Sequence, residues 1–249
     1  MNLKYVVEKK IRDLVNAFGF DLHRLKSTNS SIYHLANSLN VFKIDTVFDV
    51  GANIGQFASE IRQKGFKGSI VSFEPLSFAH VELSKNAKHD QNWIIHPRCA
   101  LGDQAGDSII NISGNSVSSS ILEMLDSHVN AADKSVYVDK EIVPIVTVDT
   151  IFEQYIKGDG KVFLKIDTQG YEWRVLNGAL KSLSLIDGVL LEVSLVELYK
   201  GQKLWQDVIS RLENEGFKLW AIDRVFSDPF NGRTLQCDVV FFHQRVLQS

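Results

Sequence analysis

The sequence of 249 residues predicts an α/β fold, in which a mostly parallel sheet carries helices on both faces. Two observations support this class. Short apolar, β-branched runs alternate with helical patterns over most of the chain, and one such run, residues 46–50, leads directly into a glycine-containing turn and a helix. The strand, turn and helix in this order bring bare backbone close to a ligand at a helix N-terminus.

Two helices are predicted ahead of this strand. Apolar residues from Leu3 to Phe18 lie on one side of the first helix, opposite a basic side, and Gly19 ends it; residues 32–42 form the second. A basic amphipathic helix could bind a membrane surface, whereas the same pattern also suits a helix that caps the main domain or joins copies into a homo-oligomer. We therefore expect a helical extension at residues 1–45 and one domain at residues 46–249.

All strands are predicted from apolar runs that end at glycine or polar residues. They comprise residues 46–50, 69–73, 93–100, 108–112, 141–148, 162–166, 188–193, 217–222 and 238–242. Helical patterns separate most of them, which predicts right-handed crossovers between parallel strands. Residues 108–112 and 141–148 are expected to pair. The last two strands follow one another without a helix, and this predicts an antiparallel pair.

Composition and charge limit the classes of partner and the location that we expect. The net charge is −3 and no long basic run occurs, which argues against a nucleic-acid backbone as the main partner. Cys99 and Cys237 lie far apart in apolar surroundings and are expected to be buried free thiols. No apolar run reaches about 18 residues and no signal-peptide pattern is present, so we expect no transmembrane segment and a cytoplasmic location.

The turn after the first strand of the domain carries the most specific pattern. Asp49 precedes G-A-N-I-G, whose glycines lie four apart, and this spacing differs from the dinucleotide fingerprint G-x-G-x-x-G. The next strand ends at Glu74-Pro75, and Glu74 follows Gly51 by 23 residues, about where an acidic residue binds a ribose. The pattern indicates a site for a nucleoside-containing cofactor, and a nicotinamide-dependent oxidoreductase is disfavoured because its fingerprint is missing.

Several segments in succession resemble the FkbM family of methyltransferases: V-F-D-V-G-A-N-I-G-Q-F, S-F-E-P, A-L-G-D-Q-A-G, V-T-V-D-T-I, F-L-K-I-D-T-Q-G-Y-E, V-L-N-G-A, L-E-V-S and Q-C-D. The resemblance runs from about residue 46 to residue 243. It implies a Rossmann-like methyltransferase fold, with a seven-stranded, mostly parallel sheet and an antiparallel last strand. It also implies S-adenosylmethionine as cofactor and, as acceptor, a hydroxyl on a sugar, glycolipid or natural product. The acceptor is thus expected to be a small molecule or a glycan- or lipid-linked compound.

The cofactor residues follow from the motif positions. Asp49 is expected near the methionine half, Gly51 and Gly55 permit close backbone approach, and Glu74 is expected to accept bonds from both ribose hydroxyls. Gly55 could instead serve packing alone, and Gly102-Asp103 could be only a turn. The predicted cofactor-binding residues are Asp49, Gly51, Ala52, Asn53, Gly55, Gln56, Phe57, Glu74, Pro75, Ala100, Leu101, Asp103 and Asp167.

Three carboxylates are predicted to be catalytic: Asp167 at the end of a strand, Glu172 at the start of the following helix, and Glu192 within an apolar strand. A base at such an edge would take a proton from the substrate hydroxyl. Glu172 could instead be a helix-dipole partner and Glu192 part of a structural ion pair. No metal is predicted, although together the three could hold magnesium.

The insertion at residues 106–144, with its serine-rich loop at residues 113–120, is expected to cover the acceptor. The competing function is a catalytically silent module that binds the adenosyl cofactor without transferring a methyl group. The three carboxylates weigh against that alternative.

Overall fold

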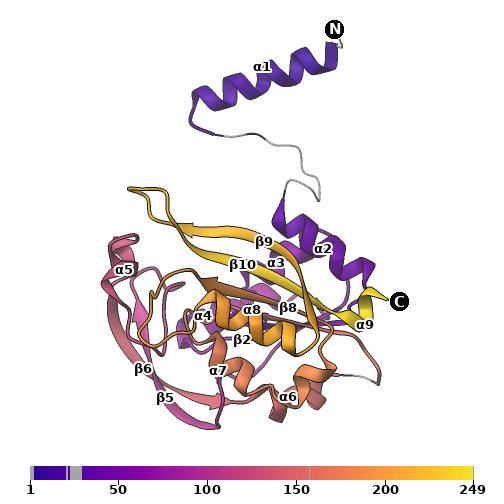
Figure 1. The fold of residues 1–249 in the computed structure, drawn as a ribbon, viewed down its shortest axis with the longest axis vertical. Coiled ribbons are helices and arrows are strands. Elements are labelled where there is room, and N and C mark those ends of the chain that lie inside the picture. The colour runs from indigo at the N-terminus through magenta and orange to yellow at the C-terminus, as the bar shows by residue number, and fades with distance from the viewer. Residues whose placement is uncertain (1–2, 21, 23–29, 157, 249) are drawn as a thin grey trace.

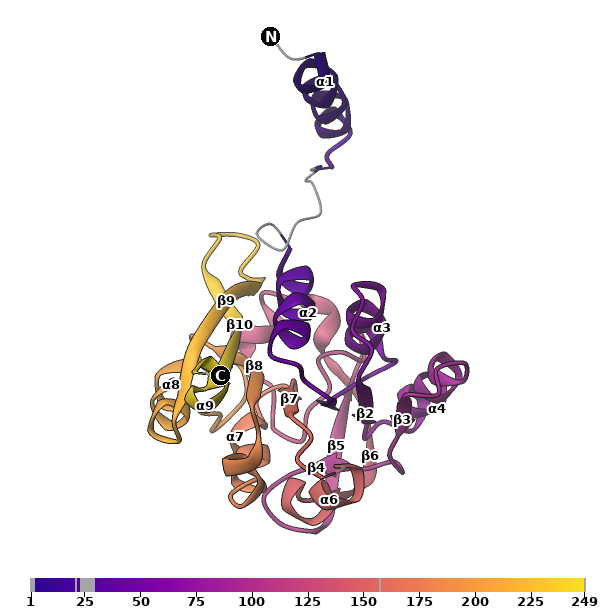
Figure 2. The same cartoon turned by 90° about the vertical axis from the view of Figure 1, so that its right-hand side faces the viewer.

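The computed structural model describes residues 3–20, 22, 30–156 and 158–248 (Figure 1). Two helices, α1 (Leu3–Ala17) and α2 (Ser31–Val41), precede the first strand, as the sequence predicts. Figures 1 and 2 show α1 standing away from the α/β body, whereas α2 lies against it. No described helix is both long and apolar enough to span a bilayer.

Seven strands form the central sheet, in the order β3 (Trp93–Ile95), β2 (Ser69–Phe73), β1 (Thr46–Val50), β7 (Val162–Ile166), β8 (Gly188–Ser194), β10 (Thr234–His243) and β9 (Phe217–Ser227). Neighbours pair in parallel from β3 to β8, and β10 pairs antiparallel with both β8 and β9. The predicted α/β class, with a mostly parallel seven-stranded sheet and an antiparallel strand at its end, is therefore confirmed (Figure 2).

The predicted strand at residues 93–100 is wrong in its extent. β3 ends at Ile95, and Ala100–Leu101 forms a separate strand, β4, in a second sheet of order β4-β6-β5. Pro97 lies between them; it has no N–H to donate to a ladder and it restricts the residue before it, so the strand stops there. In the second sheet β5 (Gly106–Ser113) pairs antiparallel with β6 (Tyr137–Val146), which confirms the predicted pairing.

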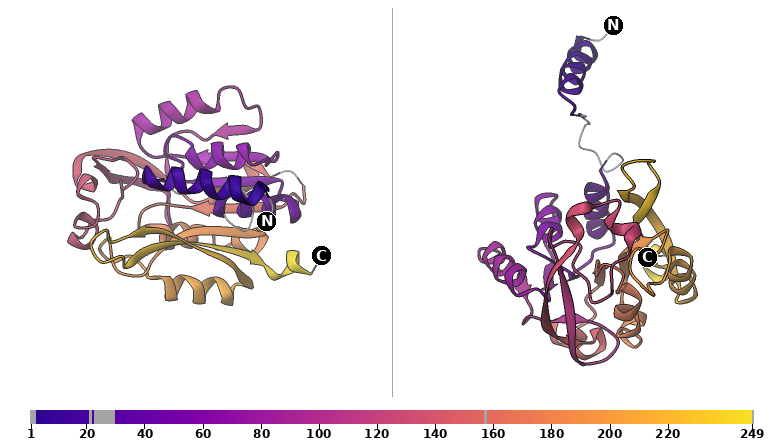
Figure 3. Two further views of the ribbon diagram at one scale, coloured as in Figure 1. Left: turned by 90° about the horizontal axis from the view of Figure 1, so that it is seen from above. Right: turned by 90° about the vertical axis from the view of Figure 1, so that its left-hand side faces the viewer.

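Helices cover both faces of the central sheet (Figure 3). On one face lie α2, α3 (Gln56–Gln63) and α4 (Ser77–Ala87); on the other lie α6 (Val148–Tyr155), α7 (Glu172–Asn177) and α8 (Trp205–Asn214). Thr147 caps α6 by accepting a hydrogen bond from the N–H of Thr150 at 3.2 Å. Short helices complete the chain at α5 (Asp126–Val129), η1 (Asp133–Ser135), η2 (Ser182–Leu185) and α9 (Gln244–Leu247).

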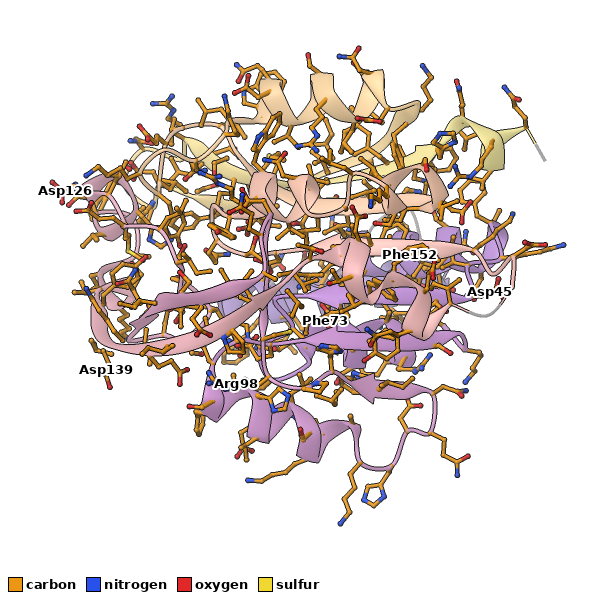
Figure 4. The ribbon with its side chains drawn as sticks, turned by 90° about the horizontal axis from the view of Figure 1, so that it is seen from below. Asp45, Phe73, Arg98, Asp126, Asp139 and Phe152 are labelled. Carbon is orange, nitrogen blue, oxygen red and sulfur yellow. The ribbon has the colours of Figure 1, made fainter. Side chains whose placement is uncertain are left out.

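The alternation of side chains along each strand divides the core in two. Phe48 of β1 packs toward α6–α8, together with Phe73 and Phe152, whereas Val47 packs toward α2–α4. Figure 4 shows Phe73 and Phe152 inside the molecule, while Asp126 lies at its periphery. Both cysteines are buried and free, as expected. By the same alternation Asp49 lies on the α2 side, and this placement positions the site.

Candidate functional site

A cavity of about 400 Å³ opens at the carboxyl ends of β1, β2 and β7. Its wall is formed by the turn after β1, the end of β2, the serine-rich loop, and parts of α2, α3, β9 and β10. The carboxyl edge of a parallel sheet is where α/β folds bind ligands.

The turn after β1 requires glycine at its first position. Gly51 has φ +74°, and a Cβ built on it would lie 1.8 Å from the carbonyl oxygen of Asp167. No other residue fits there without moving the end of β7. A Cβ on Gly55 would lie 2.7 Å from the ring of Trp93, and Gly55 is not on the cavity wall. Its close contact is with packing neighbours, which favours the packing alternative for this glycine.

Glu74 lies on the cavity wall at the end of β2 and is 3% exposed. Its Oε2 accepts the N–H of Asn53 at 2.6 Å and its Oε1 accepts the N–H of Leu76 at 2.9 Å. Burial raises the pKa of Glu74 to about 7, and the two backbone N–H groups oppose that rise. The carboxyl group is thus held between two backbone segments and remains available on the cavity side.

Asp49 lies beneath the cavity and pairs with Lys165. The Nζ of Lys165 is 3.1 Å from Oδ1 of Asp49, and both side chains are buried. The same Nζ donates to the carbonyls of Val50 and Gly51 at 3.4 and 3.0 Å. Oδ2 of Asp49 accepts from the hydroxyl of Ser72 at 3.2 Å. Burial alone would lower the pKa of Lys165, but the charges of Asp49 and Asp167 outweigh it and raise the pKa.

Asp167 follows β7 and belongs to a hydrogen-bonded cluster centred on Gln169. The Nε2 of Gln169 donates to Oδ1 of Asp167 at 2.9 Å and to Oε2 of Glu192 at 2.8 Å. Its Oε1 accepts from the hydroxyl of Tyr199 at 2.8 Å, and Gln236 donates to the same Oε2 of Glu192 at 2.6 Å. Gln169 has φ +54°, a strained conformation that the surrounding bonds hold in place. Burial and the nearby charge of Asp167 raise the pKa of Glu192.

Glu172 holds the loop that follows Asp167. Its Oε1 accepts the N–H groups of Thr168 and Gly170 at 3.0 and 3.1 Å, and the hydroxyl of Thr168 at 3.2 Å. Burial raises the pKa of Glu172 to about 7. The side chain is not on the cavity wall. Its contacts fix the backbone between the end of β7 and α7.

The structure brings together ten of the thirteen predicted cofactor residues on the cavity wall: Gly51, Ala52, Asn53, Gln56, Phe57, Glu74, Pro75, Ala100, Leu101 and Asp167. Asp49 and Gly55 lie behind the wall. Asp103 instead forms an ion pair with Arg174, 2.7 Å from its Nη1, outside the wall. Of the three predicted catalytic carboxylates, Asp167 lines the cavity, whereas Glu172 and Glu192 lie behind it.

Sequence reasoning missed one side of the cavity, which is formed by Ser31, Ile32 and Leu35 of α2 and by Asp223, Asp238 and Val240 of β9 and β10. Periodicity identifies these segments as helix and strand but does not show that they meet at one edge of the sheet. Asp238 carried a usable signal, because a carboxylate within an apolar strand needs a partner or a function. Burial raises the pKa of Asp238 to about 7.

Ser116, Ser119 and Ser120 of the serine-rich loop also line the cavity. The hydroxyl of Ser120 donates to the carbonyl of Gln169 at 2.7 Å, which links this loop to the Asp167 cluster. Within the described part of the chain, no group of three or more His, Cys, Asp or Glu side chains is arranged to hold a metal ion.

Comparison with known proteins gives a family match. The family described as Methyltransferase FkbM domain matches residues 49–219. No curated protein sequence matches the chain.

Solved structures resemble this fold at low sequence identity. Magnesium protoporphyrin IX methyltransferase of Synechocystis PCC 6803, with bound SAM, is 11% identical, with a TM-score of 0.46 over 94% of this chain and 96% of that one. Precorrin-6y C5,15-methyltransferase of Geobacter metallireducens is 10% identical, with a TM-score of 0.43 over 85% and 87%. A candidate tRNA (m1A22) methyltransferase of Streptococcus pneumoniae, in complex with S-adenosyl-L-methionine, is 12% identical, with a TM-score of 0.48 over 86% and 72%.

The buried ion pair leads to a stability prediction. Lys165→Met leaves the buried carboxylate of Asp49 without its cation and should lower the free energy of unfolding by about 3–5 kcal/mol. Lys165→Met combined with Asp49→Asn removes both charges and should recover a large part of that loss. Urea denaturation followed by circular dichroism measures both, with Lys181→Met at an exposed position as the control. Equal losses in the single and double variants would contradict the assigned pairing.

Proposed function

The chain belongs to the FkbM family of methyltransferases, and we propose that it transfers a methyl group from S-adenosylmethionine to a hydroxyl of a sugar, glycolipid or natural product. The observation that carries the proposal is the position of Glu74 and Asp167 on one cavity wall, beside the glycine turn after β1. A carboxylate for a ribose and a carboxylate for an acceptor proton thus share one cavity. The net charge of −3 favours a small or glycan- or lipid-linked acceptor over nucleic acid, and the proposed location is cytoplasmic.

The residues present fit the cofactor. Glu74 presents a carboxylate whose two oxygens each already accept one backbone N–H, and their remaining lone pairs would accept the ribose hydroxyls. Gly51 lets the turn pack against the end of β7, and Gly51, Ala52 and Asn53 line the cavity beside Glu74. Leu101 and Cys99 supply apolar wall beside Glu74, which suits a flat adenine. When bound, S-adenosylmethionine supplies an electrophilic methyl group on a sulfonium.

The work of the chain is then alignment and proton transfer. The acceptor oxygen must lie about 3 Å from the methyl group, in line with the departing sulfur. Asp167 is positioned to take the hydroxyl proton, because Gln169 fixes one of its oxygens and Lys165 lies 3.7 Å from the other. Glu172 and Glu192 act through the loop and through Gln169, as positioning groups. The serine-rich loop covers the acceptor side.

Cofactor binding tests the proposal directly. Calorimetric titration with S-adenosylhomocysteine should show binding in the micromolar range, and Glu74→Ala should weaken it by roughly 10- to 150-fold, the value of one or more hydrogen bonds to a charged group. Glu82→Ala removes a surface carboxylate from α4 and should leave binding unchanged. NAD is the parallel ligand. Binding of NAD in place of S-adenosylhomocysteine would contradict the proposal.

The pH dependence of S-adenosylhomocysteine binding tests whether the carboxyl group of Glu74 binds the ligand. Because the pKa of Glu74 is about 7 and hydroxyl donors bind its ionised form, affinity should fall about tenfold from pH 8 to pH 6 and level off above pH 8. Glu74→Gln should flatten this profile.

The stability of the fold depends on pH in the opposite direction. Because the pKa of Glu74 is raised in the folded state, the protonated carboxyl group favours folding. The contribution of Glu74 to the free energy of unfolding is therefore full below about pH 4.5 and is lost as pH rises through 7.

The rate of methyl transfer tests whether Asp167 acts as the base. Transfer of labelled methyl from S-adenosylmethionine to a panel of sugars and glycolipids, with amines in parallel, should label hydroxyl acceptors. With such an acceptor, Asp167→Asn should lower kcat by roughly 10²–10⁴-fold while affinity for S-adenosylhomocysteine is retained. Asp103→Asn, in the ion pair outside the cavity wall, is the control and should keep kcat. Unchanged kcat for Asp167→Asn at saturating acceptor would remove Asp167 from the proposed role.

A further inference from the structure

Helix α1 presents an apolar stripe that nothing in the described structure covers. Val7, Ile11, Leu14 and Phe18 follow one another at spacings of four, three and four, so they share one side of the helix and its C-terminal turn. Their exposed fractions are 49, 48, 62 and 74%. Figures 1 and 2 show the helix apart from the α/β body, so the body does not bury this stripe.

Basic residues accompany the stripe. The helix has four basic residues (Lys4, Lys9, Lys10 and Arg12) and two acidic ones (Glu8 and Asp13), which gives a net charge of +2. The whole chain has a net charge of −3, so the remainder has −5. The positive charge of the N-terminal region is therefore concentrated where the apolar side chains are exposed, a combination typical of helices that lie in the interface of an anionic membrane.

A second copy of the chain fits the apolar stripe of α1 less well than a membrane surface does. The 4-3-4 spacing also suits a coiled-coil seam, but it spans only about two heptads, fewer than the three or four that indicate a coiled coil. A helix of 15 residues is marginal in water by itself, so it needs a surface that orders it without a long partner helix. A lipid interface meets this requirement along the full stripe.

We propose that α1 binds the headgroup region of an anionic lipid bilayer, with Val7, Ile11, Leu14 and Phe18 buried among the upper acyl chains and with Lys9, Lys10 and Arg12 at the phosphates. Thirteen residues separate Ala17 from Ser31, so the two ends lie at most about 50 Å apart. Ser31 and Ile32 begin α2 and line the cavity. Binding of α1 thus holds the cavity within reach of the lipid surface. This inference does not depend on which reaction the cavity performs.

Co-sedimentation with vesicles tests the proposal on the full chain. Vesicles of phosphatidylcholine mixed with phosphatidylglycerol should carry the protein into the pellet, and added salt should weaken binding. Ile11→Glu with Leu14→Glu should weaken binding roughly a hundredfold, since two apolar side chains no longer enter the bilayer. The matched control, Val81→Glu with Leu180→Glu, introduces the same charges at exposed apolar positions of the body and should bind as the unmodified chain does.

A second variant separates the electrostatic contribution. Lys9→Gln, Lys10→Gln and Arg12→Gln together should lose the preference for anionic over pure phosphatidylcholine vesicles, a change of roughly a hundredfold. Failure of the unmodified chain to sediment, or equal sedimentation of the Ile11→Glu, Leu14→Glu variant, would overturn the proposal. So would a dimer, measured by light scattering, that the same variant dissociates while vesicles bind neither protein. Circular dichroism confirms that each variant is folded.

Discussion

The buried ion pair between Lys165 and Asp49 is the interaction on which the site depends. Each partner lies on the α2 side of the sheet, on adjacent strands whose other residues on that side are apolar. The ammonium also binds the carbonyls of Val50 and Gly51, where β1 becomes the turn. One buried cation therefore fixes the strand end, the turn and, at 3.7 Å, the carboxylate of Asp167. Because an unpaired charge at this depth is costly, these parts hold one another in register.

The carboxylates around the cavity differ in what they touch, and this separates their roles. Glu74 and Asp167 line the cavity. Glu172 instead accepts hydrogen bonds from the loop after β7, and Glu192 accepts them from side-chain amide groups. Burial raises the pKa of Glu74 and of Glu172 to the same value of about 7, yet only Glu74 lines the cavity, where the remaining lone pairs of its carboxylate can accept hydrogen bonds from a ligand. Glu74 and Glu172 thus have the same pKa but different roles, ligand binding for Glu74 and loop geometry for Glu172. Their contacts, and not their pKa, distinguish these roles.

The sequence predicted the parts of the fold that local chemistry determines. β1, β2 and β7 begin and end at the predicted residues, because each is a short apolar run bounded by glycine or polar residues. The strand at residues 93–100 failed because Pro97 interrupts hydrogen bonding within an otherwise apolar run.

Contacts between distant strands were harder to predict. The glycine turn and Glu74 were found from their spacing. The pairing of Gln169 with both Asp167 and Glu192 depends on strand register and on a left-handed backbone conformation, neither of which a pattern of residue types reveals.

The two sides of the cavity have different relations to the family. The match covers residues 49–219 and includes the glycine turn and Glu74, which form the proposed cofactor side, and Asp167, the proposed base. Leu35 of α2 and Asp223, Asp238 and Val240 of β9 and β10 line the opposite side and fall outside that range.

Strand alternation explains why these distant segments meet. Lys165, Leu190, Asp238 and Val240 all point to the face that α2 covers, so residues of α2 and of β10 line the same cavity. Family membership therefore supports the cofactor and methyl transfer, whereas α2, β9 and β10 add to the serine-rich loop a part of the cavity wall that the family match does not cover. An apolar wall at Leu35 and Val240 beside the carboxyl group of Asp238 suits an acceptor that presents an apolar part next to its hydroxyl groups.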